Sequence, residues 1–268
     1  MNRFVIVSGL VAALVLSACN ADLASTTGDV LGAAEEATAT TGNGKKDAQV
    51  SAAGDVFKAA TVSDSELRAY SRQMIAARDK QAPVAKAGDK YATRLARLTR
   101  KHAREDGLKL NFKVYLTKDV NAFATPDGSI RVYSGLMDLM TDDELLSILG
   151  HEIGHVKNGH SLQKMRTAYL ASAGAKLASA QGKLSAQVLS ELGESFVNAQ
   201  FSQSMESDAD TYGIAFLKRN KYKLPAAESA MRKLADLDGT AAGGSNSLFS
   251  SHPGSGQRAD KIHELISE

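Results

Sequence analysis

The sequence has a single cysteine, Cys19, so no disulfide can form within the chain. Its formal net charge at pH 7 is only +2, and it has no basic cluster with interleaved aromatic residues, so we expect no nucleic-acid partner. No apolar run after Leu16 is long enough to cross a bilayer. What remains is a chain of 268 residues, 43% hydrophobic and 23% charged, which suffices for one well-sized core.

The start of the sequence has the pattern of a secretory signal. Arg3 is followed by an uncharged apolar run from Phe4 to Leu16, and then by small residues up to Cys19. A charged start, a short apolar core and small residues at a cleavage point are typical of a signal peptide, and this run is too short for a spanning helix. We therefore expect residues 1–18 to be removed.

Cys19 indicates how the mature protein is held. The ending Leu16-Ser17-Ala18-Cys19 resembles a bacterial lipobox, in which the cysteine is lipidated and becomes the first mature residue. Asn20 follows instead of aspartate, which in such lipoproteins indicates the outer membrane. Because several acyl chains on one residue anchor a protein stably, we expect a lipid-anchored protein on the bacterial outer membrane, facing the periplasm. The alternative is a free thiol after an ordinary signal peptide.

The next part of the chain is poor in large apolar residues. Residues 19–60 are rich in Ala, Thr, Gly, Ser and Asp, so they cannot bury a core of their own. We expect a flexible tether over residues 19–60 and a folded domain over residues 61–268.

The segment His151-Glu152-Ile153-Gly154-His155 has the clearest chemistry in the sequence. On a helix, His151 and His155 lie about 40° apart around the axis and roughly 6 Å apart along it, so both imidazoles can reach one tetrahedral zinc ion. Glu152 lies about 100° round from His151, where a carboxylate can contact a water at the metal without binding the metal itself. The alternative is a chance occurrence of the pattern.

The surrounding sequence predicts the helix that this site requires. Thr141 and Glu144 form a capping box, and the acidic residues of the first turn suit the positive end of the helix dipole. Apolar residues then recur at helical spacing, namely Leu145, Leu149, Ile153 and Val156. Gly150 and Gly154 each oppose a helix by up to about 1 kcal/mol. Because each precedes a histidine, we expect another backbone to pack closely there.

The rest of the pattern predicts an α+β domain that is predominantly helical. Alternating apolar residues predict strands at Phe112–Leu116, Val120–Ala124 and Ser129–Ser134, with a turn sequence at Thr125–Gly128. We therefore expect a small, largely antiparallel sheet beside the HExxH helix. His102 is expected to be exposed. Other helices are expected over residues 63–80, 88–105, 160–181, 185–220, 225–238 and from 257 onwards.

Two histidines leave a catalytic zinc one protein ligand short. Glu206 is our candidate, because Asp210 follows one turn later on the same helix face, so one carboxylate can bind zinc while the other orients a ligand histidine. Asp208 points about 200° away from Glu206 and is less suitable. Glu191 and Glu194 remain possible on chemistry alone. Periodicity also leaves open that Glu206 and Asp210 are ordinary surface acids.

Several motifs occur together in one order: VNAFA, SIRVYSGLM, HEIGHVKNGH, FSQSMESDAD and the terminal HPGSGQR. This combination resembles the HtpX-like and CAAX-protease family of zinc metallopeptidases, and in particular its periplasmic lipoprotein branch. The resemblance implies a zincin-like metallopeptidase domain in which His151, His155 and Glu206 bind one zinc ion. It also implies that Glu152 is the catalytic acid/base and that Asp210 contacts a ligand rather than the ion.

The family pattern also has a His-Pro pair with an arginine six residues after the histidine. His252, Pro253 and Arg258 match it. A loop histidine here could donate a hydrogen bond to a developing oxyanion, or it could occupy the open position on zinc and hold the enzyme latent. The alternative is that His252 only caps the last helix.

The expected function is zinc-dependent endopeptidase cleavage of unfolded or misassembled envelope proteins. Glu152 would take a proton from zinc-activated water and pass it to the leaving amine. Extended substrate can add to an edge strand with little demand on its sequence; the residues of that strand are Val120, Asn121, Ala122, Phe123 and Ala124. The resemblance likewise implies envelope quality control, with other envelope proteases or assembly machinery as candidate partners.

Two other functions are compatible with these motifs. A zinc-containing, chaperone-like assembly factor would bind clients with little turnover, although an intact Glu152 argues against a purely structural zinc, which needs four closed protein ligands. A peptidase of prenylated or membrane substrates is disfavoured, because nothing after Leu16 can span a bilayer.

Overall fold

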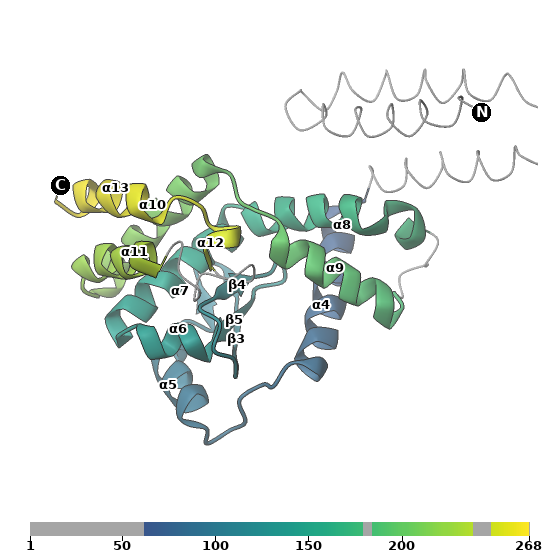
Figure 1. Cartoon of the computed structure of the whole chain (residues 1–268), viewed down its shortest axis with the longest axis horizontal. Coiled ribbons are helices and arrows are strands. Elements are labelled where there is room, and N and C mark those ends of the chain that lie inside the picture. The colour runs from purple at the N-terminus through teal and green to yellow at the C-terminus, as the bar shows by residue number, and fades with distance from the viewer. Residues whose placement is uncertain (1–61, 179–183, 238–247, 268) are drawn as a thin grey trace, which may run out of the picture. The chain divides into compact units, whose positions relative to one another are not determined.

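A computed structural model describes residues 62–178, 184–237 and 248–267, and it confirms a predominantly helical α+β fold with a small sheet (Figure 1). The expected signal peptide (residues 1–18), Cys19 and the expected tether (residues 19–60) lie outside the described residues. In the described part of the chain, no helix combines the length and the apolar character needed to cross a membrane.

The helices and strands follow one another in an order that brings the sheet before the central helix. Helices α4 and α5 precede the strands, and the remaining helices follow them. In chain order the elements are α4 (Asp64–Gln81), α5 (Lys90–Thr99), β1 (Arg104–Glu105), β2 (Leu108–Lys109), β3 (Asn111–Tyr115), β4 (Ala122–Ala124), β5 (Ser129–Tyr133), α6 (Ser134–Leu139), α7 (Asp142–Lys157), α8 (His160–Ala178), α9 (Ala186–Asn198), α10 (Gln203–Asn220), α11 (Pro225–Leu237), α12 (Leu248–Ser251) and α13 (Ser255–Ser267).

The main sheet has the strand order β3-β5-β4. β4 and β5 form the expected antiparallel hairpin, in which Ala122 pairs with Val132. Its turn is closed by the Thr125 N–H, which donates to the Ser129 carbonyl, and Gly128 adopts the left-handed φ of 85° that this turn requires. β3 runs parallel to β5, so the sheet is mixed, and β4 lies at one of its edges.

Helix α7 is the centre of the fold. The expected capping box is present, with Thr141 accepting from the Glu144 N–H and the Glu144 carboxylate accepting from the Thr141 N–H. Every residue from Glu144 to Val156 is buried, so α7 is covered on all sides rather than along one stripe. It packs against α10, α11, α8 and β4. In Figure 1, α10, α11 and α13 lie on one side of α7, and α4, α8 and α9 lie on the other.

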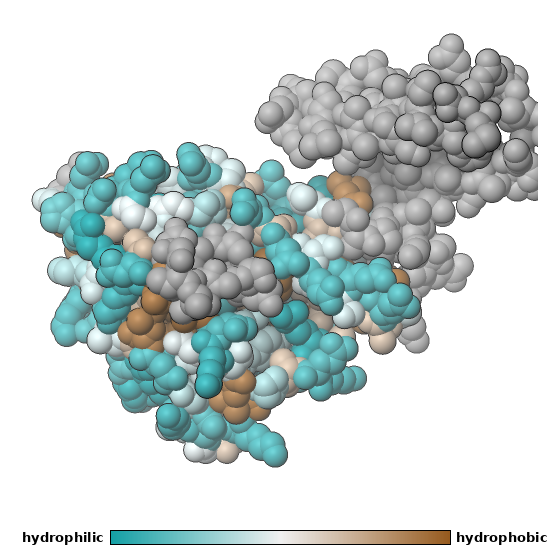
Figure 2. Space-filling model, in the orientation of Figure 1, coloured by the Kyte–Doolittle hydropathy of each residue, from teal (hydrophilic) through white to brown (hydrophobic). Residues whose placement is uncertain are grey.

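Two hydrophobic clusters flank this helix. The larger contains the apolar residues of α5, α7, α11 and α13 with the inner face of the sheet, and the smaller lies among α4, α8, α9 and the aromatic residues of the strands. Figure 2 shows mostly hydrophilic residues on the described surface in that view, with small separate hydrophobic patches. The apolar residues of α7 belong to the larger cluster, which holds this helix against the sheet and against α10 and α11.

The two glycines of α7 are sites of close packing, as expected. A Cβ atom at Gly150 would lie 2.6 Å from Cδ1 of Phe216. A Cβ atom at Gly154 would lie 3.1 Å from the carbonyl oxygen of Ala209. Both neighbours belong to α10, so the absence of two side chains lets α10 approach α7 closely.

Three expectations about this part of the chain are wrong. The helix expected over residues 185–220 is two helices, because the backbone is extended at Ala199 and Ser202 starts α10 by accepting from the Met205 N–H. The helix expected over residues 88–105 ends at Thr99. His102 is only 2% exposed, because its ring lies 4.8 Å from that of Phe216 and is hydrogen-bonded on both sides.

Candidate metal centre

The two histidines of α7 point to the same place. The Nε2 atoms of His151 and His155 lie 2.9 Å apart, and both side chains are buried. Their four-residue spacing on one helix accounts for this, since it stacks the two side chains on one face. The Nδ1 atom of each ring faces outward from this pair, toward Asp210 for His151 and toward His160 for His155. The Nε2 atoms therefore remain for a shared ligand.

Helix α10 brings Glu206 to these two rings. Its Oε1 lies 3.4 Å from Nε2 of His155, and its Oε2 lies 3.6 Å from Nε2 of His151. Glu206 is 1% exposed and stands in the first turn of α10, which begins after the Ser202 cap. The close approach of α10 at Gly154 makes this meeting possible.

His252 completes a cluster of four possible ligands. Its Nδ1 lies 2.9 Å from Oε1 of Glu206 and 3.3 Å from Nε2 of His151. One ligand atom from each of His151, His155, Glu206 and His252 lies within 4.8 Å of the others, and all four residues are buried. Three imidazoles and a carboxylate are a donor set that suits zinc.

The protonation of these groups favours a metal. The Asp210 carboxylate accepts hydrogen bonds only, so Nδ1 of His151 carries the proton and Nε2 offers a lone pair to the cluster. Burial holds the pKa of His155 well below its ordinary value, so this ring is neutral at pH 7. Burial opposes ionisation of Glu206, but His252 and His155 hold its pKa well below the usual range. The residues present therefore fit a divalent cation.

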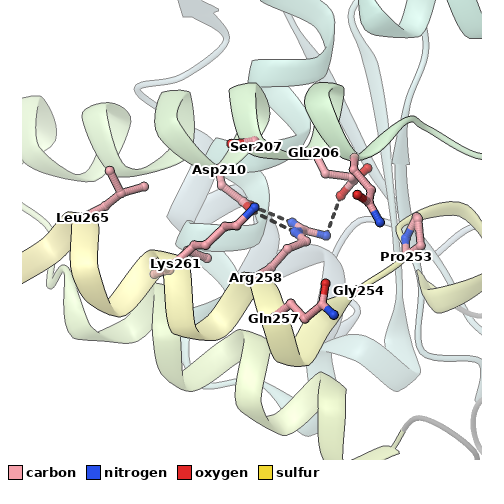
Figure 3. A pocket seen from close by; sticks show the side chains of 11 residues that line it. Glu206, Ser207, Asp210, Pro253, Gly254, Gln257, Arg258, Lys261 and Leu265 are labelled. Carbon is pink, nitrogen blue, oxygen red and sulfur yellow. Dashed lines mark hydrogen bonds and ion pairs between the residues drawn. The ribbon is translucent and has the colours of Figure 1, made fainter.

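Asp210 and Arg258 support the cluster from one side, and Figure 3 shows Arg258 joined to both Asp210 and Glu206. Asp210 Oδ1 lies 2.9 Å from Nδ1 of His151. Arg258 binds the same carboxylate with two hydrogen bonds, Nη2 to Oδ1 at 2.6 Å and Nε to Oδ2 at 2.8 Å. Its Nη1 also forms an ion pair with Glu206. A single guanidinium thereby fixes both carboxylates of α10 relative to the histidines.

A small cavity of about 40 Å³ lies on the outer side of this arginine. It is lined by residues of α10 and α13, among them Glu206, Asp210 and Arg258, with Pro253 at its end (Figure 3). The cavity has room for only a few water molecules, so it is too small to be a substrate cleft in this conformation.

Glu152 is the one carboxylate of the centre without a fixed partner. The residue is fully buried, and neither of its carboxylate oxygens has a hydrogen-bond partner among the described residues. Nε2 of His252 lies 3.6 Å from its Oε1. A buried carboxylate beside the cluster, outside the ligand set, is placed to accept and return a proton.

The structure brings most of the residues predicted from the sequence into one site, but not all of them. His151, Glu152, His155, Glu206, Asp210, His252 and Arg258 all lie in one buried centre. Asp208 does not join it: its side chain is 67% exposed. Glu191 hydrogen-bonds to Gln187 on its own helix, and Glu194 is exposed.

The expected edge strand is shorter than predicted and is covered: β4 spans Ala122–Ala124, so Val120 and Asn121 precede it. Val120, Asn121, Ala122, Phe123 and Ala124 are all buried, with β4 at the sheet edge and packed on α7. The Leu248 N–H donates to the Val120 carbonyl at 3.0 Å, and the Phe201 N–H donates to the Ser251 carbonyl at 3.1 Å. The segment that carries His252 is thus hydrogen-bonded both to the start of the edge strand and to the segment before α10.

Sequence reasoning missed two residues of the centre. The ring of Phe201 stacks on that of His155, with centroids 3.8 Å apart and an interplanar angle of 17°. The ammonium of Lys164 lies 4.4 Å from the centre of the same Phe201 ring. Phe201 lies within the FSQSMESDAD motif, but an isolated aromatic residue before a cap does not identify its contact. Nothing in the pattern of α8 distinguishes Lys164 from a surface lysine.

Comparison with known proteins places these residues in a wider group. Residues 89–266 match peptidase family M48. The chain is 39% identical over 217 residues to metalloprotease YcaL of Escherichia coli, covering 79% of this chain and 84% of that protein. It is 38% identical over 224 residues to metalloprotease LoiP of the same organism, covering 81% of this chain and 87% of that protein. A putative beta-barrel assembly-enhancing protease of Vibrio cholerae is 29% identical over 147 residues, covering 50% of this chain and 30% of that protein.

Proposed function

The chain belongs to peptidase family M48 and is a metalloendopeptidase, and from this premise we propose that it uses zinc to cleave unfolded or misassembled envelope proteins. The observation that carries the proposal is the cluster of His151, His155 and Glu206 with an unpartnered Glu152 beside it. Those four side chains are the parts of a zinc hydrolase that uses a glutamate as its general base.

We propose that His151, His155 and Glu206 hold the ion. Zinc in such a site lowers the pKa of a water and polarises a carbonyl group. Glu152 then works with its own carboxylate oxygens, which accept a proton from the water and return it to the leaving amine. Asp210 keeps the proton on Nδ1 of His151, so that the opposite nitrogen stays available throughout.

His252 has two candidate roles, and the geometry favours latency. Its ring lies inside the ligand cluster, and its Nε2 is 3.6 Å from the oxygen of Glu152, where a substrate carbonyl would need room. We propose that His252 blocks the centre until the segment beginning at Leu248 moves away from the edge strand. His252→Ala should then raise peptide cleavage. A fall in kcat would instead assign His252 to oxyanion stabilisation.

The proposed substrates follow from the edge strand. Once uncovered, β4 offers backbone donors and acceptors that pair with any extended chain, so unfolded polypeptides are preferred to folded ones. The Vibrio cholerae relative is named for enhancing β-barrel assembly, which supports a role in envelope quality control beside other envelope proteases or assembly machinery. This protein would cleave chains that fail to assemble.

The proposed location rests on Cys19. We propose that it is lipidated and that the protein faces the periplasm from the outer membrane, because the residues up to Cys19 resemble a lipobox and Asn20 follows. Incorporation of labelled palmitate into the wild type, and its loss in Cys19→Ala, would support this location. Equal labelling of the two proteins would contradict it.

The decisive experiment compares the wild type with Glu152→Gln. We expect zinc-loaded wild type to cut denatured casein at internal bonds, to stop when zinc is chelated and to recover when zinc is returned. Glu152→Gln should bind zinc equally but cleave roughly 100- to 10,000-fold more slowly. Glu194→Gln is a matched control, since Glu194 is exposed and should tolerate the same change. A Glu152→Gln protein with full activity would contradict the role of Glu152.

The closed arrangement also favours a second candidate function. Four buried ligands around one point are typical of a structural zinc, as a chaperone-like assembly factor with little turnover would have. Complementation of a deletion strain separates the two functions. Rescue by Glu152→Gln would assign binding as the main function, whereas rescue by the wild type alone would assign proteolysis.

A further inference from the structure

Lys164 of α8 is a buried cation next to the proposed catalytic centre. Only 5% of the residue is exposed. Its ammonium lies 4.4 Å from the ring centre of Phe201 and 5.1 Å from that of Phe196. Burial lowers its pKa to about 8, while the charges of Glu152 and Glu206 favour the protonated form. The side chain is therefore an ammonium at pH 7, held between two aromatic rings.

This ammonium lacks the partners that the other deeply buried cations have. Arg131 forms an ion pair with Asp79, and Arg258 forms one with Asp210. Among the residues that the structure describes, none accepts a hydrogen bond from Lys164 or forms an ion pair with it. Aromatic faces attract a cation, but they do not replace a carboxylate as the acceptor for its three N–H donors. A buried charge without a hydrogen-bonded counterion is costly and is stabilised when an anion arrives.

The position of Lys164 indicates which anion this is. Phe201 lies against both Lys164 and His155, so the ammonium is separated from a proposed metal ligand by a single side chain. The other charges that act on it most strongly are those of Glu152 and Glu206, within the centre itself. A group that binds Lys164 from inside the centre would therefore belong to a substrate residue close to the bond being cleaved.

We propose that Lys164 is a specificity-determining residue that binds a substrate carboxylate beside the scissile bond. This inference rests on the proposed endopeptidase function and defines its substrate class as peptides with aspartate or glutamate next to the cleaved bond. A free C-terminal carboxylate has the same chemistry, so the experiment must separate an internal acidic residue from a chain end.

The covering segment contacts the aromatic ring that lies against this ammonium. The ring of His252 lies 5.0 Å from that of Phe201, and the Ser251 carbonyl accepts from the Phe201 N–H. Movement of this segment away from the edge strand would uncover Phe201 and, behind it, the ammonium. A purely apolar role is a poorer explanation, because methionine would pack against the two phenylalanines without an unpaired charge.

The test is a double-mutant cycle between the enzyme and its substrate. Internally quenched peptides would carry Glu or Gln at each position flanking one scissile bond, with an amidated and a free C-terminus for each. They would be assayed with zinc-loaded wild type, Lys164→Met and Lys164→Arg. A charge-assisted hydrogen bond predicts a Glu-over-Gln ratio in kcat/KM of roughly 10 or more for the wild type at one position. We expect the ratio to fall to about 1 in Lys164→Met and to recover in Lys164→Arg.

Binding gives a readout that is independent of turnover. In a Glu152→Gln background, fluorescence anisotropy should show the same preference for the Glu peptide, and adding Lys164→Met should abolish it. Thermal melting checks the fold of each variant. If Lys164→Met does not fold, the test rests on whether the wild type prefers the Glu peptide and whether Lys164→Arg keeps that preference.

The outcomes separate this inference from the function on which it rests. A wild type that cleaves the peptides without preferring Glu at any position overturns the role of Lys164 and leaves the endopeptidase function intact. An unchanged ratio in Lys164→Met does the same. A preference that appears only with a free C-terminus assigns the carboxylate to the chain end and overturns the internal acidic residue. A wild type that cleaves neither peptide nor casein overturns both proposals.

Discussion

The packing of α10 on Gly154 predicts a measurable link between helix contact and metal affinity. In Gly154→Ala, the new Cβ would lie 3.1 Å from the carbonyl oxygen of Ala209, 3.1 Å from Cβ of Tyr212 and 3.2 Å from Cα of Ala209. These are backbone and near-backbone atoms, so they cannot rotate away. The two helices must separate by a few tenths of an ångström, and Glu206 moves with α10.

The expected magnitude combines two opposing effects. Overpacking of a tight contact costs about 1–3 kcal/mol, whereas alanine gains up to about 1 kcal/mol over glycine in a helix. We expect Gly154→Ala to lower the free energy of unfolding by about 1 kcal/mol. Gly150→Ala should cost more, because its Cβ would lie 2.6 Å from Cδ1 of the fully buried Phe216 ring. Displacement of Glu206 should also weaken zinc binding by roughly 10-fold, as changes in ligand support commonly do.

Urea unfolding of the metal-free proteins and competition with a zinc chelator would measure the two effects separately. Gly193→Ala on α9 is the control, since its Cβ would meet only the flexible side chain of Met74, at ordinary distances of 3.5 Å to Cγ and 3.9 Å to Sδ. It should leave zinc affinity unchanged and gain up to about 1 kcal/mol of stability. If Gly154→Ala gained as much stability as Gly193→Ala and bound zinc equally well, the close contact would not set the ligand geometry.

Three further predictions concern single side chains. Burial opposes ionisation of Glu144, but hydrogen bonds led by that from Lys233 lower its pKa to about 2. The pKa of a glutamate in the unfolded chain is about 4.3, so the ionised Glu144 stabilises the folded state fully above about pH 4.3, and this contribution is lost as the pH falls toward about 2. Urea unfolding of Glu144→Gln should therefore show a loss of about 3 kcal/mol at pH 7 and about half of that at pH 3, and a pH-independent loss would contradict the assignment. Phe201→Leu removes the ring stacked on His155 and should weaken zinc binding about 2- to 10-fold in chelator competition, and an unchanged affinity would show that the stack does not orient the imidazole. Arg258→Lys loses the two-pronged hydrogen bonding to its carboxylate partner and should weaken zinc binding roughly 10- to 100-fold, with circular dichroism showing an intact fold; equal affinity would remove Arg258 from the support of the centre.

Local chemistry made the catalytic helix predictable from its sequence. The capping box at Thr141, the four-residue spacing of His151 and His155, and the glycine beside each histidine all act within one helix or on its immediate neighbour. Predicting that Glu206 meets the histidines required the family motif as well, because periodicity alone left two other glutamates as possible ligands. The structure places Glu206 there, within 3.6 Å of both rings.

Contacts between distant segments were not predictable in this way. The separation of α9 from α10 depends on the Ser202 cap. The helical pattern of the sequence continues on both sides of Ser202, so it did not reveal this break. His102 lies in a run of cations, and its burial is caused by Tyr222 and Phe216, which come much later in the chain. The parallel pairing of β3 with β5 has no local turn signal, because β4 separates the two strands in the sequence although they are direct neighbours in the sheet.

The proposed catalytic centre draws on segments that are synthesised at very different times. His151 precedes His252 by 101 residues and Arg258 by 107. As the chain is made from its N-terminus, the helix with both α7 histidines emerges long before the arginine that binds the α10 carboxylates and the histidine that we propose blocks the centre. A partly synthesised polypeptide therefore has the two imidazoles without the groups that support them. Arg258, which completes that support, and His252, which we propose blocks the centre, are then synthesised almost together. The order of the chain would protect a nascent protease from digesting itself and its neighbours while they are still unfolded.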